Sequence, residues 1–403
     1  MNYNFTKLID RRGKDATAVD SIGKIKWGFE PKGAKPGFDE IPMWVADMNF
    51  ETAPSIVRAI EERLQHPLFG YFSASDAYYE SIIDWQKKHY GYTDLTADMI
   101  GYENGVHGGI TSTINTVTQP GDAVFLHSPT YVGFMEDLEH TGRRPILSPI
   151  VKDSEGVWRM DFDDMERKLS ESGAHLAIFC SPHNPTGRVW ERWEIEKAME
   201  LFKKHDCVVI SDEIWSDLIM PGYTHIPTIT VSKDAASRTV ALYAPSKTFN
   251  LAGLIGSYHI IKNPLLREKV TRFGVYTAYN EMNVLSMHAL IGAYKPEGEV
   301  WLSELLAVLE SNCRYATDFI NNNLKGCHAS MPQGTYMVFM DCRDYMKESG
   351  ETLDQIMEAG WDVGVAYQDG RHFNDDGSIR INVALPHSRV VEAFDRLAKY
   401  VFV

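Results

Sequence analysis

The chain has 403 residues, 44% hydrophobic and 24% charged, a balance typical of a globular protein with room for a large and a smaller domain. Its net charge of -15 argues against a nucleic-acid surface, because such surfaces gather Lys and Arg. The start of the chain is not a signal peptide and no run of about 18 apolar residues occurs, so we expect a cytoplasmic protein with a small-molecule substrate and no membrane partner.

The predicted elements begin with a helix near Gly105, where Val106, Ile110 and Ile114 recur at helical spacing. The free N–H groups of a helix N-terminus bind anions, and a glycine there lets the backbone approach a phosphate closely. This helix is therefore a candidate site for a cofactor phosphate.

Short apolar runs bounded by turn signals follow, separated by helical patterns. Such runs are typical of buried strands in a mostly parallel sheet, which makes the region an α/β domain. The runs lie at residues 122–129, 175–182, 206–213, 239–246 and 256–263.

The C-terminal part has a different pattern. Residues 334–341 and 378–386 resemble half-exposed strands, and helices are expected at about 301–323 and 388–402. These elements predict a smaller α+β domain. The expected division is an N-terminal segment, 1–48, that joins the small domain, a large domain at 49–290 and a small domain at 291–403.

Polar side chains follow three consecutive strand-like runs. Asn184 follows the run at 175–182, and Asp212 lies near the end of the run at 206–213. Lys247 follows the run at 239–246. Strands of a parallel sheet deliver their carboxyl ends to one edge, where ligands bind in open α/β sheets. Taken singly, Lys247 could be a solvated side chain, Asp212 a helix cap and Asn184 part of an Asx turn. Together they predict a site.

No metal site is expected. The five cysteines form no CxxC pair and the fourteen histidines form no HExxH motif. The cysteines are interpreted as reduced core residues. No GxGxxG follows a strand, which weakens a nicotinamide interpretation.

Four segments, "SPHNPTG", "SDEIW", "APSKTFNLAGL" and "IRINVALP", resemble in order the landmarks of the fold-type I pyridoxal-phosphate (PLP) enzymes, the aminotransferase class I/II superfamily. The resemblance spans nearly the whole chain. It implies an α/β fold in which a large domain with a mostly parallel seven-stranded sheet is joined to a smaller α+β domain. It also implies PLP as the cofactor.

The same resemblance implies a role for each matching residue. Lys247 would hold PLP as a Schiff base and then remove the substrate Cα proton. Asp212 would pair with the pyridinium nitrogen, Asn184 would hydrogen-bond the ring's phenolic oxygen beside the substrate, and Tyr131 would stack on the ring. Arg380 would bind the substrate α-carboxylate through two parallel hydrogen bonds.

Further positions match the phosphate-binding part of the family pattern. Gly105, Val106 and Ser246 would serve the phosphate within one chain. Tyr71 matches the tyrosine that, in relatives, reaches the phosphate of the partner subunit. The resemblance therefore implies a homodimer in which Tyr71 completes the partner's active site.

Within the superfamily the chain is most similar to the cystathionine β-lyase branch, the C-S lyases. Many aminotransferases carry an arginine eight residues after the Schiff-base lysine, whereas this chain has Ile255, and "PMWVADMNF" at 42–50 resembles a segment of that branch. The resemblance favours β-elimination of L-cystathionine or a related cysteine S-conjugate to pyruvate, ammonia and a thiol. An L-amino-acid aminotransferase, an amino-acid racemase and a PLP-binding regulator remain alternatives.

The chain also departs from the branch pattern. Asn49 stands where the branch usually has Asp, and "ALPHSR" follows Arg380 in place of the usual "CPR". Trp215 stands where a His or Tyr is expected; an indole can only donate a hydrogen bond and is larger. It is interpreted either as a packing residue or as a substrate-binding residue that reshapes the pocket.

Overall fold

The computed structural model describes residues 2–24 and 28–403. Its large sheet has the strand order β2-β9-β8-β7-β6-β3-β4-β5. The five neighbours from β8 to β4 are parallel, whereas β2 and β8 pair antiparallel with β9. The strands are β2 (Ile100–Glu103), β3 (Ala123–Ser128), β4 (Arg144–Lys152), β5 (Trp158–Met160), β6 (Leu176–Cys180), β7 (Val208–Asp212), β8 (Thr239–Tyr243) and β9 (Ser257–Ile260).

The predicted mostly parallel sheet is confirmed, but the expected number of seven strands is wrong, because the part of the chain that the structure describes forms eight. The additional strand is β5, three residues that pair antiparallel with the end of β4. A tight turn makes this return, in which the Asp153 carboxylate accepts hydrogen bonds from the backbone N–H groups of Glu155 and Val157. Sequence periodicity is weak over so short a strand.

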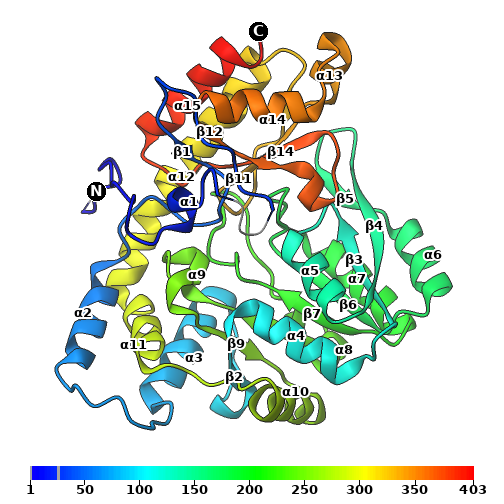
Figure 1. Ribbon diagram of the computed structural model, residues 1–403. Helices are drawn as coiled ribbons and strands as arrows, with labels where there is room; N and C mark the ends of the chain where they lie inside the picture. Colours follow the sequence, from blue (N-terminus) through cyan, green and yellow to red (C-terminus); the bar gives the residue numbers. More distant parts are fainter. Residues whose placement is uncertain (1, 25–27) are drawn as a thin grey trace.

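Helices cover both faces of the large sheet (Figure 1). On one face, α4, α5 and α10 pack against alternate strand residues such as Ile178 and Leu242. On the other face, α6, α7 and α8 pack against Phe179 and Val209. The bounds are α3 (Asp76–Tyr90), α4 (Gly105–Val117), α5 (Val132–His140), α6 (Phe162–Ser172), α7 (Arg192–Lys204), α8 (Lys233–Arg238), α9 (Pro245–Thr248), α10 (Pro264–Thr277) and α11 (Val284–Ala293).

The C-terminal elements lie at the top of Figure 1, above the large sheet. They form an antiparallel sheet in the order β10-β11-β14-β13, and the helices α12 and α15 pack together against it. The bounds are α12 (Pro296–Asn323), β10 (His328–Ala329), β11 (Met337–Asp341), α13 (Arg343–Ser349), α14 (Leu353–Asp362), β13 (Gln368–Asp369), β14 (Ser378–Asn382) and α15 (His387–Tyr400).

The expectation of half-exposed strands in this sheet is wrong. Every residue of β14 is buried, and in β11 Asp341 alone is partly exposed. Ile379 and Ile381 pack in a hydrophobic cluster with α12 and α15, while Arg380 on the opposite face contacts Asn184 of the large domain. Both faces of β14 are therefore covered.

The N-terminal residues join the C-terminal elements. β1 (Ile41–Pro42) pairs parallel with β12 (Val365–Ala366), and the indole of Trp44 donates a 2.9 Å hydrogen bond to the carbonyl of Ala18 in α1 (Thr17–Asp20). The chain then enters α2 (Pro54–Leu64). The domain limits at residues 48 and 290 stay a prediction. No helix among the described residues is long and apolar enough to span a membrane.

Candidate active site

Three neighbouring strands deliver the predicted side chains to one edge of the large sheet. β6, β7 and β8 are adjacent, and their register aligns Cys180 with Asp212 and Asp212 with Leu242. Asp212 is the last residue of β7, Asn184 follows β6, and Lys247 lies in α9, directly after β8. The predicted convergence of these strand ends is confirmed.

The amine of Lys247 is held inside the protein. It donates a 2.8 Å hydrogen bond to the carbonyl of Ala46 and lies 5.7 Å from the ring centroid of Trp215. Burial lowers the pKa of Lys247 to about 8, and the nearby Arg380 charge acts in the same direction. The neutral amine, which is the nucleophilic form, is therefore accessible close to neutral pH.

Asp212 is a buried carboxylate, 4% exposed. It accepts a 3.1 Å hydrogen bond from the backbone N–H of Ile214, and it forms no ion pair with any residue in 2–24 or 28–403. Burial raises the pKa of Asp212 to about 6. Burying a carboxylate without a cation is costly, so this position fits a cationic group supplied by a ligand.

Arg380 reaches the same region from β14. Its guanidinium donates to the Asn184 side-chain oxygen at 3.1 Å, to the carbonyl of Trp44 at 2.9 Å and to the Gln368 side-chain oxygen. It is 3% exposed, and burial lowers its pKa to about 10. Its Nε has no hydrogen-bond partner, and it pairs with no carboxylate in the described chain. An unpaired buried guanidinium is suited to an anionic ligand.

Tyr131 occupies the N-cap position of α5 and lines the same cavity as Lys247 and Arg380. Its ring stands edge-on to Phe134, with 5.3 Å between centroids. Burial raises the pKa of Tyr131 to about 12, so the phenol keeps its proton. Its hydroxyl lies 3.3 Å from Nε2 of His107, which belongs to the first turn of α4.

The predicted phosphate residues lie at two helix starts. α4 begins at Gly105, whose φ of 74° is in the left-handed region that favours glycine. Val106 follows it in the first turn, where backbone N–H groups have no partner within the helix. Ser246 lies in the short α9, beside Lys247.

The cavity has a volume of about 770 Å³. Residues 9–11 and 14–17 of the N-terminal segment form one wall and residues 44–47 another, and Tyr131, Lys247 and Arg380 are among the other residues that line it. Of the predicted site residues, three line this cavity, and seven do not: Tyr71, Gly105, Val106, Asn184, Asp212, Trp215 and Ser246. Trp215 is 2% exposed and packs against the Tyr336 ring at 4.8 Å, and Tyr71 is fully exposed on the loop between α2 and α3.

Sequence reasoning missed the contribution of the N-terminal segment. Arg11 forms an ion pair with Asp47 at 2.5 Å and donates to the Asn49 side-chain oxygen at 3.2 Å. Asp47 and Asn49 lie in the 42–50 segment that resembles the C-S lyase branch, but no sequence pattern around Arg11 indicates a partner. Gln368, which holds Arg380, had no sequence signal either.

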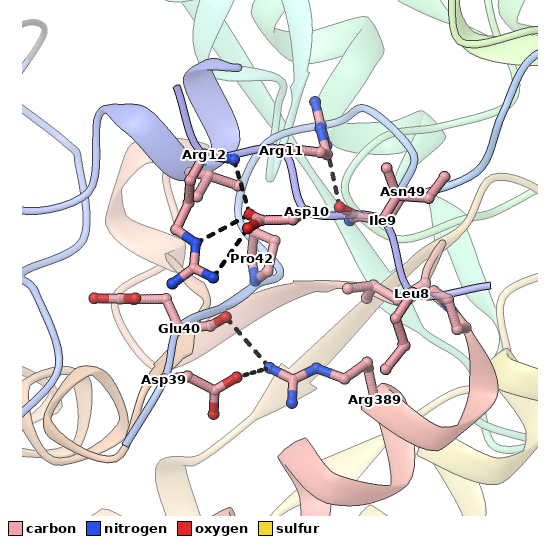
Figure 2. Close-up of a pocket in the computed structure, with 13 residues that line it drawn as sticks. Leu8, Ile9, Asp10, Arg11, Arg12, Asp39, Glu40, Pro42, Asn49 and Arg389 are labelled. Carbon is pink, nitrogen blue, oxygen red and sulfur yellow. Dashed lines mark hydrogen bonds and ion pairs between the residues drawn. The ribbon is translucent and has the colours of Figure 1, made fainter. Parts of the chain in front are cut away.

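The N-terminal segment separates two cavities. Figure 2 shows the second, of about 270 Å³, where Arg12 contacts Asp10 and Arg389 contacts Asp39. Ile9, Asp10 and Arg11 line both cavities. Residues 9–11 therefore lie between this cavity and the Lys247 cavity.

A model of the family described as aminotransferase class I and II matches residues 40–397. The chain belongs to this family. It is 31% identical over 397 residues to cystathionine beta-lyase PatB of Bacillus subtilis (strain 168), with 98% of each chain covered. Among solved structures, it is similar to PLP-containing cystalysin from Treponema denticola (30% identity, TM-score 0.90, covering 99% of this chain and 98% of that one). It is also similar to the PLP-bound C-S lyase from Staphylococcus hominis (30% identity, TM-score 0.89, covering 100% and 99%).

Membership of the aminotransferase class I and II family and the PLP-bound neighbours imply PLP as the cofactor. The residues present fit it. A buried carboxylate without a cation, Asp212, suits a protonated ring nitrogen, and Lys247 offers an amine to an aldehyde. The free N–H groups at the start of α4 suit a phosphate.

Proposed function

We propose that this enzyme is a PLP-dependent C-S lyase that eliminates a thiol from L-cystathionine or a related cysteine S-conjugate. One observation carries the amino-acid part of the proposal: an amine with a lowered pKa, Lys247, lines the same cavity as an unpaired buried guanidinium, Arg380. The lyase part is supported by similarity over almost the full length to proteins named cystathionine beta-lyase and C-S lyase.

Arg380 would orient the substrate. Its planar guanidinium can form two parallel hydrogen bonds with an α-carboxylate: Nε–H has no partner among the described residues, and Nη2 would exchange one of its present contacts, with the Trp44 carbonyl or the Gln368 side chain, for the second carboxylate oxygen. Asn184, Gln368 and the Trp44 carbonyl already hold the rest of the guanidinium in place. This arrangement would fix the substrate Cα and point its side chain into the cavity.

Lys247 would hold the PLP aldehyde and, once exchanged for the substrate amine, would accept the Cα proton. Bound PLP supplies an electron sink for the pair left by that proton. Asp212 would keep the proton on the ring nitrogen, which sustains that sink. Loss of a thiolate from Cβ then gives aminoacrylate, which water converts to pyruvate and ammonia.

We also propose that the functional unit is a homodimer. Three large side chains of the loop between α2 and α3 are exposed to solvent, with relative accessible surfaces of 66% for Leu68, 58% for Phe69 and 110% for Tyr71. Large apolar side chains this close together and this exposed are typical of a surface that another chain covers. Tyr71 does not line the cavity of its own chain. Its side chain would therefore be available to contact the PLP phosphate in the partner subunit.

The deciding experiment mixes the PLP-loaded protein with L-cystathionine in the absence of a keto acid and follows pyruvate, free thiol and the cofactor absorbance. We expect repeated turnover with equal amounts of pyruvate and thiol. One stoichiometric transfer of the amino group to the cofactor, without pyruvate, would instead identify an aminotransferase. Exchange of the Cα proton with loss of optical activity would identify a racemase.

The control is Lys247→Ala, which retains the Arg380 and Asp212 sites but lacks the amine. It should give neither product. Residual turnover close to the wild-type rate in this variant would remove Lys247 from the chemistry and with it the proposed reaction.

A further inference from the structure

His107 connects two helices beside Tyr131, which lines the cavity. It lies in the first turn of α4, and its Nδ1 is 2.8 Å from a carboxylate oxygen of Asp137 in α5. Its Nε2 is 3.3 Å from the hydroxyl of Tyr131. Asp137, His107 and Tyr131 therefore form a continuous hydrogen-bonded chain that ends at the cavity.

A glycine makes room for this imidazole. A Cβ atom at Gly133 would lie 2.2 Å from Cε1 of His107 and 2.6 Å from Cε1 of Tyr131, both shorter than any tolerated contact. The two rings therefore lie against the bare backbone of the first turn of α5. The imidazole side chain is 48% exposed, and its contact with Gly133 and its two hydrogen bonds hold it on this surface.

The chain of contacts does not depend on the protonation state of His107. A neutral imidazole that donates Nδ1–H to Asp137 leaves Nε2 to accept the Tyr131 hydroxyl, and a charged one donates from Nε2 to the same oxygen. Burial lowers the pKa of His107, but the hydrogen bond and charge of Asp137 outweigh it and leave the pKa above its usual value. The charges of Asp212 and Lys247 also act on this imidazole.

We propose that His107, anchored by Asp137, is a positioning residue that holds the Tyr131 ring in the orientation needed to stack against PLP. The inference rests on the proposed binding of PLP beside Tyr131, but not on which reaction follows. Because the hydrogen bond to its hydroxyl already restricts rotation of the Tyr131 ring, PLP binding costs less side-chain conformational entropy.

Two substitutions at one position separate the two contacts of the imidazole. His107→Gln places an amide near the position of Nε2, within reach of the Tyr131 hydroxyl, whereas His107→Asn places it near Nδ1, within reach of Asp137 alone. The PLP dissociation constant is measured by quenching of tryptophan fluorescence. The loss of one hydrogen bond predicts an increase of about fivefold for His107→Asn and less than about twofold for His107→Gln.

The same measurements in a Tyr131→Phe background complete the test. Without the hydroxyl, His107→Asn should change PLP affinity by less than about twofold, and the circular dichroism of the bound cofactor should match that of Tyr131→Phe alone. Asp137→Asn, which removes the carboxylate beside Nδ1 but leaves the contact between Nε2 and the Tyr131 hydroxyl, should weaken PLP binding by less than about twofold, as His107→Gln does. Thermal unfolding of each apoprotein checks that the variants fold.

Equal losses for His107→Asn in both backgrounds would overturn the proposal, because His107 would then act without Tyr131. Unchanged PLP affinity in all His107 variants would also overturn it. The readout is independent of the proposed reaction: a protein that binds PLP but releases no thiol from L-cystathionine would refute the lyase proposal while this cycle still decides the role of His107.

Discussion

The amine of Lys247 and the carbonyl oxygen of Ala46 are joined by a 2.8 Å hydrogen bond across 201 positions of sequence. The hydroxyl of Tyr336 donates to the same carbonyl at 3.1 Å. One carbonyl thus brings together a residue of α9, the 42–50 segment and the residue that precedes β11 of the C-terminal sheet. The lysine is held in place before any cofactor arrives, and its environment determines its acidity.

The rate at which the apoprotein captures PLP covalently should rise with pH and level off slightly above pH 8. Burial lowers the pKa of Lys247 to about 8, and only the unprotonated amine attacks an aldehyde. Stopped-flow absorbance between pH 6 and about 10 measures this rate. A rate that keeps increasing to the pKa of an exposed lysine, about 10.4, would contradict the predicted environment.

Asp212→Asn should stabilise the apoprotein at pH 8 by about 1 to 3 kcal/mol. The folded-state pKa of about 6 is higher than the usual 3.8, so the wild-type carboxylate lowers the free energy of unfolding progressively as pH rises between these values. Urea unfolding at pH 4 and pH 8 should show a gain in the free energy of unfolding at the higher pH alone.

With PLP bound, turnover of Asp212→Asn should fall about 100-fold or more, because an amide has no charge to retain the ring proton.

Arg380→Lys should lower kcat/KM for L-amino-acid substrates about 100-fold, because an ammonium cannot form the two parallel hydrogen bonds with a carboxylate. The matched control is Arg343→Lys in α13, where an arginine 46% exposed pairs with Asp375 outside the cavity. Steady-state kinetics of both variants make the comparison. Similar losses in the two would mean that Arg380 acts through the fold and does not bind substrate.

Trp215→His should separate the two interpretations of this indole. Trp215 is buried against Tyr336 and does not line the cavity, so the free energy of unfolding should fall by about 2 to 4 kcal/mol while KM changes less than twofold. Thermal or urea unfolding and steady-state kinetics measure the two effects. A large change in KM with little loss of stability would instead place the indole in the substrate pocket.

Mixing two inactive variants tests the shared site of the proposed dimer. Tyr71→Ala and Lys247→Ala should each have little activity, and each homodimer would lack one of the two groups at both sites. A mixed dimer places an intact Lys247 and an intact Tyr71 in one of its two sites. Unfolding and refolding the mixture should restore about a quarter of wild-type activity if the chains pair at random. A mixture no more active than its components would rule out sharing.

The convergence of Asn184, Asp212 and Lys247 was predictable because it follows from strand periodicity and the parallel order of β6, β7 and β8. The helix that starts at Gly105 was predictable from apolar spacing alone. These features depend on short stretches of chain, each of which carries its own pattern.

The other contacts depend on residues that meet only after folding. Arg11 and Asp47, His107 and Asp137, and Arg380 and Gln368 are ordinary polar residues until the tertiary structure brings them together. The burial of β14 could not be predicted either, because alternation along a strand does not tell what covers its polar face. That face is covered by the active site itself.

The pairing of β1 with β12 has a consequence for how the chain is made. Ile41 aligns with Val365, so β1, which is synthesised first, cannot pair until β12 is synthesised near the end of the chain. Until then Ile41 and Met43, both buried in the finished protein, lack the C-terminal residues that pack against them, whereas Trp44 already has Ala18 as a hydrogen-bond partner. The nascent chain thus exposes an apolar segment through most of translation. A ribosome that stalls before β12 would release a product prone to aggregate.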